Sequence, residues 1–325
     1  MNSERLTTAV AQSNEAARRP LLGTIFVSPS ESRLRAGWRL VLQTLLELVI
    51  VLTLSIAMIL IPGYVLSPYA NMETLQGLGL GEVKGLVAIT LSILLARRFL
   101  DHRSFAGLGL AIGPRTVRDL AVGAGIGATM MSLLFILNWQ LGWAVIDGFA
   151  WSMDTPLTMV LNLIGFLFLY VLVAWNEELM SRGYHLQTIA SGTNMFWAMI
   201  LSSAVFGLLH LLNSNGSWAG AVGCTLAGLL LCFAYLRSGG LWLGIGLHTT
   251  WNFFEGVVFG FPVSGLNNYR LIRIAIQGSQ AWTGGSFGPE AGWLIVPIIA
   301  VGAVLVYAYG GRNRTPDTPT TSAAV

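Results

Sequence analysis

Residues 157–182 read LTMVLNLIGFLFLYVLVAWNEELMSR, an apolar run that ends in two glutamates and an arginine. The apolar part, Leu157–Val173, holds no charged residue, and a helix needs about 20 mostly apolar residues to cross a bilayer. Of the 325 residues, 54% are hydrophobic and only 10% are charged, whereas a soluble domain carries about 25% charged residues. The stretch therefore predicts a membrane-spanning helix that carries ionisable groups at its end.

Apolar runs of similar length recur along the chain and predict an all-α fold, a polytopic transmembrane helix bundle of about eight spans. The second run is the weakest, because Glu82 and Lys84 interrupt it. We see no internal repeat of the kind that a transporter built from two repeated halves would show. The expected spans are Val41–Tyr64, Leu78–Leu95, Leu120–Trp143, Leu157–Val173, Met195–Leu212, Trp218–Leu236, Leu241–Phe259 and Trp293–Tyr309.

Composition and charge predict the domain boundaries and the orientation. Residues 1–37 and 311–325 are polar, and we expect a disordered cytoplasmic N-terminal tail and a disordered C-terminal tail around a membrane domain at 38–310. In the eight-span arrangement, 15 of the 18 Lys and Arg residues fall on one side. The positive-inside rule then places both termini in the cytoplasm of a multi-pass cell-membrane protein. Cys224 and Cys232, inside the sixth run, are expected to be packing residues.

The first group of candidate site residues follows the fourth apolar run. Glu178 and Arg182 are four residues apart on a helix, so they share a face and can form an ion pair. Glu177 points about 100° away from that face and has no cation nearby in the sequence. An unpaired carboxylate in a low-dielectric environment suits a general base. The alternative is a pair of surface glutamates at a helix end.

Two further groups place histidines inside expected spans, where ionisable residues are costly and mark candidate sites. His210 follows Phe206 in the fifth run and can be either a structural residue or a catalyst. His248 and Asn252 in the seventh run have i, i+4 spacing and therefore share a face. At a rise of 1.5 Å per residue, these residues and Glu177 all lie about 10–22 Å from the expected cytoplasmic face. The common depth predicts one polar cavity near mid-membrane, reachable from the cytoplasm.

Together these groups resemble the CPBP family, the CAAX-processing and bacteriocin-immunity membrane proteins, also called the type II CAAX protease or abortive-infection family. The resemblance covers a motif core at 175–254, and Ser181 departs from it, because the family often has an aromatic residue there. The matching residues are Glu177, Glu178 and Arg182 for Glu-Glu-x-x-x-Arg, Phe206 and His210 for Phe-x-x-x-His, and His248 and Asn252 for His-x-x-x-Asn/Asp.

The resemblance implies an intramembrane endopeptidase that hydrolyses a peptide bond of a membrane-anchored protein or peptide, CAAX-type or prenylated substrates included. Glu177 would activate a water molecule with help from His210. His248 and Asn252 would donate hydrogen bonds to the oxyanion, where fixed donors are most effective. Arg182 would hold Glu178 in place. The expected partners are that substrate and the lipid bilayer, and a net charge of +3 is too small to indicate nucleic acid.

Two alternatives stay open from the sequence. Zn²⁺ could be held by Glu177, His210 and His248 with an open position for water. The chain lacks a compact His-Glu-x-x-His helix, so we expect catalysis that requires no cofactor. The other alternative is a non-catalytic immunity or regulatory module of the same family, in which the same residues form a structural network.

Overall fold

The computed structural model describes residues 25–28, 33–64 and 74–310. Within these ranges, six helices are long and apolar enough to cross a membrane, which confirms a polytopic helical bundle. Residues 1–24, 29–32 and 311–325, which make up most of the expected tails, lie outside the described residues. The six helical segments are α3 (Ala36–Ile59), α4 (Leu75–Phe99), α5 (Thr116–Gln140), the continuous helix Pro156–Gly192, the helix Met195–Leu212, and α9 (Trp218–Ser238).

The last two expected spans are helical over nearly the expected residues. The seventh consists of α10 (Trp242–Asn252) and a π-helical segment, Phe253–Val258, which continues it without a break. The eighth is α12 (Ile295–Gly310), with 16 residues. Neither is among the six long helices, and α12 is a shorter apolar helix beside them.

Short α10 is held in the bundle by direct backbone contact with α5. A Cβ atom on Gly127 would lie 2.3 Å from the carbonyl oxygen of Leu247, and one on Gly246 would lie 2.2 Å from that of Leu120. The hydroxyl of Thr250 also donates to the Ala124 carbonyl across the same interface, at 2.7 Å. Small residues at a membrane helix interface allow this approach, and the result is a rigid support for the residues on α10.

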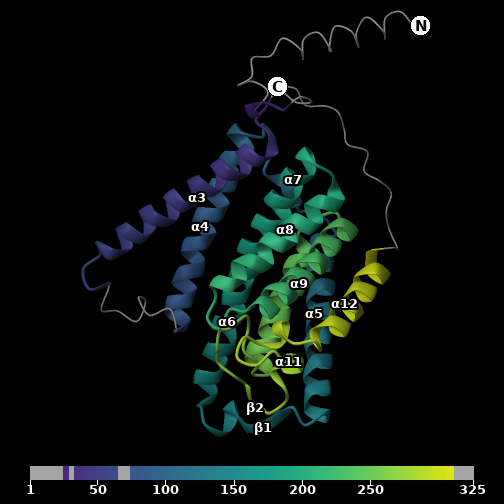
Figure 1. Ribbon diagram of the computed structural model, residues 1–325. Helices are drawn as coiled ribbons and strands as arrows, with labels where there is room; N and C mark the ends of the chain where they lie inside the picture. The colour runs from purple at the N-terminus through teal and green to yellow at the C-terminus, as the bar shows by residue number, and fades with distance from the viewer. Residues whose placement is uncertain (1–24, 29–32, 65–73, 311–325) are drawn as a thin grey trace, which may run out of the picture.

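Helix α3 lies at one side of the molecule and slants away from the bundle, and α4 lies beside it and packs against α6 (Pro156–Glu178) (Figure 1). Most of α3 is exposed and apolar, as expected of a surface that faces lipid, and its buried residues are Arg39 and Gln43. Arg39 forms an ion pair with the fully buried carboxylate of Asp101, and its other nitrogen, Nη2, donates to Ser191 at 2.6 Å. This contact fastens the start of α3 to the end of α7 (Leu186–Gly192).

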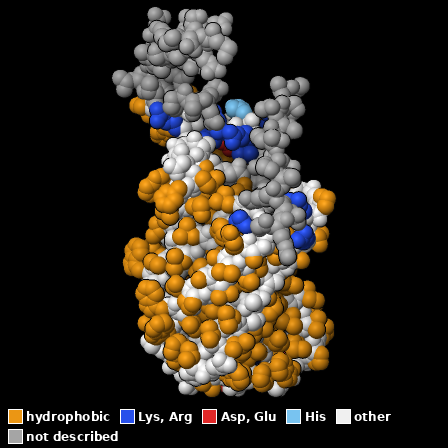
Figure 2. Space-filling view, turned by 90° about the vertical axis from the view of Figure 1, so that its right-hand side faces the viewer, with side chains coloured by type: hydrophobic (Ala, Val, Ile, Leu, Met, Phe, Trp, Pro, Cys, Tyr) orange, Lys and Arg blue, Asp and Glu red, His pale blue; other side chains and the backbone are white. Residues whose placement is uncertain are grey.

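Lys and Arg side chains gather at one end of the molecule, while the rest of the visible face is largely hydrophobic (Figure 2). The opposite end carries a two-stranded antiparallel sheet of β1 (Ala144–Phe149) and β2 (Ile272–Ile276), in which Ala144 pairs with Ile276 and Phe149 with Ile272. The sequence pattern does not predict this sheet. The one-sided charge agrees with the positive-inside argument, and the cytoplasmic position of the termini stays a prediction.

Candidate active site

A cavity of about 170 Å³ lies inside the bundle, and all four predicted catalytic residues line it. Glu177 comes from α6 (Pro156–Glu178), His248 and Asn252 from α10, and His210 from the residue that follows α8 (Met195–Leu209). The lining continues through residues after α8 and α10, such as Asn213 and Ser264. The structure therefore brings together the side chains that the sequence placed at one depth.

Glu178 and Arg182 form a buried ion pair at the back of this cavity. Arg182 donates from Nη1 to Oε1 of Glu178 at 2.8 Å and from Nη2 to the carbonyl of Gly228 at 3.1 Å, and both side chains are 1% exposed. The guanidinium also lies over the ring of Phe206, 4.4 Å from its centroid. A charge-assisted, fully buried pair of this kind fixes the position of Glu178. This geometry is consistent with the predicted role of Arg182, which is to hold Glu178 in place.

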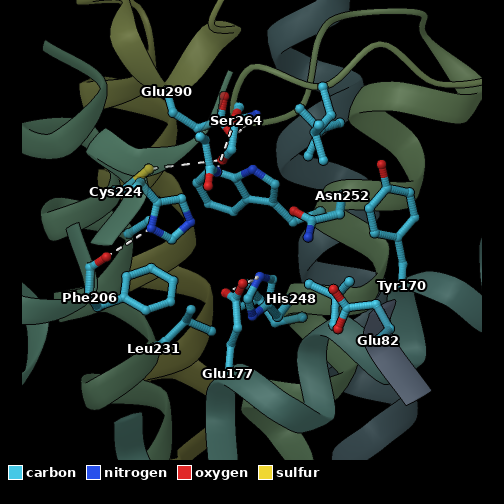
Figure 3. A pocket seen from close by; sticks show the side chains of 18 residues that line it. Glu82, Tyr170, Glu177, Phe206, Cys224, Leu231, His248, Asn252, Ser264 and Glu290 are labelled. Atoms are coloured by element: carbon cyan, nitrogen blue, oxygen red, sulfur yellow. Dashed lines mark hydrogen bonds and ion pairs between the residues drawn. The ribbon is translucent and has the colours of Figure 1, made fainter. Parts of the chain in front are cut away.

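His248 joins the two neighbouring glutamates. Its Nδ1 lies 3.1 Å from Oε1 of Glu178, and its Nε2 lies 3.6 Å from Oε2 of Glu177. Because the carboxylate of Glu178 is held by Arg182 and can only accept, we assign the Nδ1 proton to the bond with Glu178. The Nε2 edge of the ring then faces Glu177 and the cavity. Figure 3 shows Glu177 and His248 side by side on one wall.

The two glutamates differ sharply in exposure. The side chain of Glu177 is 29% exposed, whereas that of Glu178 is 1% exposed. In the described part of the chain, no Lys or Arg forms an ion pair with Glu177, and the basic side chain beside it is His248, at 3.6 Å. Water can therefore reach Glu177, while Glu178 is sealed off. Gly244 makes room for Glu178, since a Cβ atom there would lie 3.0 Å from Oε2.

His210 and Asn252 lie elsewhere on the cavity wall. The Nδ1 of His210 lies 2.8 Å from the carbonyl oxygen of Phe206, so Nδ1 carries a proton and donates it, and Nε2 is left for other partners. Asn252 is buried one helical turn after His248. Among the described residues, no hydrogen bond or ion pair joins His210 to Glu177. The contact with Glu177 is made by His248 instead, and the assisting role of His210 stays a prediction.

Both helices that carry the glutamates and His248 change to π-helical turns directly after the site. The first π-helical segment, Leu179–His185, follows Glu178, and the second, Phe253–Val258, follows Asn252. Single π-helical turns inside α-helices occur frequently at functional sites. Arg182, which pairs with Glu178, lies within the first of these segments.

Several cavity residues were missed or given little weight by the sequence analysis, and Glu290 is the clearest. It lies in the short helix Pro289–Ala291, and its Oε1 accepts from the Ser264 hydroxyl at 2.9 Å and from the Ser264 backbone N–H at 3.2 Å. Gly223 of α9 lets this segment pack closely, because a Cβ atom there would lie 1.7 Å from the Glu290 carbonyl oxygen. The only signal in the sequence was a carboxylate among apolar residues with no cation nearby.

A zinc site of Glu177, His210 and His248 was the alternative to metal-free catalysis. In the described ranges, no three His, Cys, Asp or Glu side chains are placed so that they could hold a metal ion. The three candidate ligands line one cavity without forming a ligand set, so they do not fit a three-residue zinc site in this arrangement.

Comparison with known proteins finds a family match for one segment of the chain. Residues 159–254 match the model of the Rce1-like type II CAAX prenyl endopeptidase family. No curated protein matches the chain in sequence. The matched segment begins within α6 and ends two residues after Asn252, so it contains every residue predicted for the site. Glu82 of α4 and Glu290 line the same cavity from outside the segment.

Proposed function

Because residues 159–254 carry an Rce1-like type II CAAX prenyl endopeptidase domain, we propose that this multi-pass membrane protein is an intramembrane endopeptidase. It hydrolyses a peptide bond of a membrane-associated protein or peptide with water that Glu177 activates. The observation that carries the proposal is the contrast within the Glu177–Glu178 pair. Glu178 is buried and held by Arg182, whereas Glu177 reaches the cavity with His248 beside it.

The position of His248 supports this assignment. Its Nδ1 lies 3.1 Å from Glu178 and its Nε2 lies 3.6 Å from Glu177, so the ring links the carboxylate that Arg182 holds to the one that faces the cavity. A side chain that is fixed on one edge by a buried ion pair presents its other edge to the cavity in a defined position.

The reaction follows from these positions. A water molecule in the cavity loses a proton to the carboxylate of Glu177, and its oxygen attacks the carbonyl carbon of the scissile peptide bond. The carbonyl oxygen becomes an oxyanion as the new carbon–oxygen bond forms. When the carbon–nitrogen bond breaks, the leaving nitrogen takes the proton from Glu177, which restores the carboxylate. A positioned general base of this type contributes typically about 10²–10⁴-fold to the rate.

The oxyanion is the second requirement, and His248 and Asn252 are the proposed donors. Both are buried on one face of α10, which α5 holds in backbone contact. Rigid donors in a site with little water stabilise a developing charge without having to reorganise. His210 would orient the water through Nε2, since Nδ1 is engaged by Phe206. CAAX-type prenylated peptides are the substrates that the name of the matching family suggests.

The test is cleavage of membrane-anchored peptides by purified protein, with Glu177→Gln compared with wild type. The amide cannot take a proton, so we expect the rate to fall by at least about 10²-fold while the thermal melting curve stays unchanged. Glu47→Gln is the matched control, because Glu47 is a carboxylate on α3 that lies outside the cavity and is bonded to Gln43.

Three outcomes separate the alternatives. Loss of cleavage in Glu177→Gln alone supports the proposal. Equal rates in Glu177→Gln and wild type would refute it and favour a non-catalytic module. Parallel reactions with a chelator, and with Zn²⁺ added back, test metal dependence. We expect the chelator to leave cleavage unchanged, and activity that returns only with Zn²⁺ would overturn the metal-free reaction.

A further inference from the structure

The cavity holds more carboxyl groups than catalysis by Glu177 requires. Three of them line it, those of Glu82, Glu177 and Glu290, and none of its lining residues is Lys or Arg. The basic side chains on its wall are the two histidines, His210 and His248. The chain as a whole has a net charge of +3, so this acidic lining contrasts with the composition of the rest of the protein.

Glu290 is the most deeply buried of these carboxyls, with 4% of the residue exposed. Ser264 binds one of its oxygens, and in the described part of the chain Oε2 has no hydrogen-bond donor. The neighbouring group is a second carboxyl, that of fully buried Glu255, within hydrogen-bonding reach. No Lys or Arg of the described residues forms an ion pair with either side chain. Glu290 therefore contributes to the cavity wall a buried carboxyl group whose ionisable neighbours are Glu255 and His210, with no Lys or Arg of the described residues beside it.

Glu82 provides a second such carboxyl on another wall. Its Oε2 accepts from the Asn176 amide at 2.8 Å, and the described residues provide it with no Lys or Arg partner. Tyr170 lies beside it, and its buried hydroxyl has no hydrogen-bond partner in the described ranges. Figure 3 shows Glu82 and Tyr170 at one edge of the cavity and Glu290 at the opposite edge. Unsatisfied polar groups thus face the cavity from two sides.

These groups indicate the chemistry of the molecule that fills the cavity. A buried carboxylate without a cation costs free energy, and a ligand that supplies a positive charge removes much of that cost. A free carboxylate placed in the same position would be repelled. The unpartnered Tyr170 hydroxyl can donate to a peptide carbonyl or accept from an N–H group. Binding sites commonly achieve specificity by repelling the wrong ligand as well as by attracting the right one.

We propose that the cavity selects peptides with a Lys or Arg side chain close to the scissile bond, and that Glu290 and Glu82 determine this specificity. The inference rests on the proposed peptidase function and adds the substrate class. Neither residue takes part in the chemical step. Both lie outside the segment 159–254 that matches the family, so the preference is a property of the surrounding helices and loop.

The experiment uses matched membrane-anchored peptides that differ at one position, with lysine, norleucine or glutamate, scanned over the residues on both sides of the cleavage site. We expect wild type to cleave the best lysine peptide with kcat/KM at least about tenfold above its norleucine partner, and the glutamate peptide least. Glu290→Gln should lower that ratio towards one, because kcat/KM for the lysine peptide falls more than kcat/KM for the norleucine peptide. Glu82→Gln is a second variant that tests the other wall, and Glu47→Gln is the control that keeps the full ratio.

Binding separates this inference from the proposed function. Affinity of the same peptides for the Glu177→Gln variant is measured by fluorescence anisotropy, without turnover. The inference is supported if lysine peptides are preferred in both cleavage and binding and if this preference is lost in Glu290→Gln or in Glu82→Gln. Cleavage without any preference for lysine overturns the inference and leaves the peptidase function intact. If lysine peptides bind preferentially but wild type never cleaves them, the preference for cationic ligands is retained and the peptidase function is overturned. A preference that survives in both Glu290→Gln and Glu82→Gln overturns the assignment of these residues.

Discussion

Two buried carboxyl sites beside the cavity differ in their partners. At one, Glu178 is 1% exposed, accepts a hydrogen bond from Arg182 at 2.8 Å and lies 3.1 Å from His248. At the other, Glu255 and Glu290 lie next to each other, and Ser264 donates the hydrogen bonds to Glu290. The first site is complete as it stands, because Arg182 compensates the charge of Glu178 and fixes its position. The second has no Lys or Arg partner among the described residues, and a cationic ligand can supply one.

The difference teaches how to distinguish structural from ligand-directed charge in a membrane bundle. Both sites are equally buried, so burial alone does not separate them. The chemical type of the neighbouring group separates them. Removal of one member of a compensated pair leaves an isolated charge, whereas removal of one member of an acidic pair relieves repulsion. Three substitutions test this contrast, and their expected effects on stability decrease in turn.

Arg182→Met should have the largest effect. It keeps an apolar stem of similar length but leaves Glu178 buried without its cation, and breaking a buried pair in this way costs about 3–5 kcal/mol. We expect a large drop in melting temperature of the purified protein, with loss of cleavage as a consequence. Arg237→Met is the matched control, since Arg237 is less buried and donates to the Tyr307 carbonyl near the end of α12. Equal melting temperatures for Arg182→Met and wild type would show that the pair is not structural.

Glu178→Gln should have an intermediate effect. The amide oxygen still accepts from Arg182, but the charge-assisted bonds to Arg182 and His248 are weakened, at a cost of about 1–3 kcal/mol. Because Glu178 fixes the Nδ1 proton of His248, cleavage should fall by more than the loss of folded protein explains. Melting temperature and kcat, measured on the same preparation, check both parts. A fall in kcat with no change in stability would mean that Glu178 acts in catalysis alone.

Glu255→Gln should have the smallest effect on stability, with a change of no more than about 1 kcal/mol, and in the stabilising direction. The amide can donate to Glu290, which removes one of two adjacent carboxyls and adds a hydrogen bond. Thermal melting beside Glu178→Gln gives the comparison directly. A loss as large as that of Glu178→Gln would show that the acidic pair is as structural as the compensated one.

Much of the architecture was predictable, because span length and apolar composition reflect the bilayer more than tertiary detail. The helix Pro156–Gly192 and the shared face of His248 and Asn252 follow from periodicity alone. Depth along the helices placed the site residues in one layer, but depth does not specify which way each helix is rotated. For this reason the sequence did not reveal that His248, rather than His210, is the neighbour of Glu177.

The parts that the sequence did not predict depend on contacts between distant segments. Glu290 reaches the cavity because the loop after α10 folds back on α9, with Gly223 at the close contact. Pairing of β1 with β2 joins residues more than 120 positions apart, and neither strand has a strong pattern of its own. The π-helical turns after Glu178 and Asn252 are set by hydrogen bonding within the folded helix, which apolar periodicity does not encode.

Two of the carboxyl groups that line the cavity come from outside the segment that carries the other site residues. Glu177, His210, His248 and Asn252 come from a single stretch of 96 residues, 159–254, while Glu82 precedes it by 77 positions and Glu290 follows it by 36. Substitutions in α4 or in the loop that carries Glu290 can therefore change the shape and charge of the cavity without altering any residue of that stretch. Proteins that share the segment 159–254 are therefore expected to differ in the substrates that they accept, according to the residues of their flanking segments.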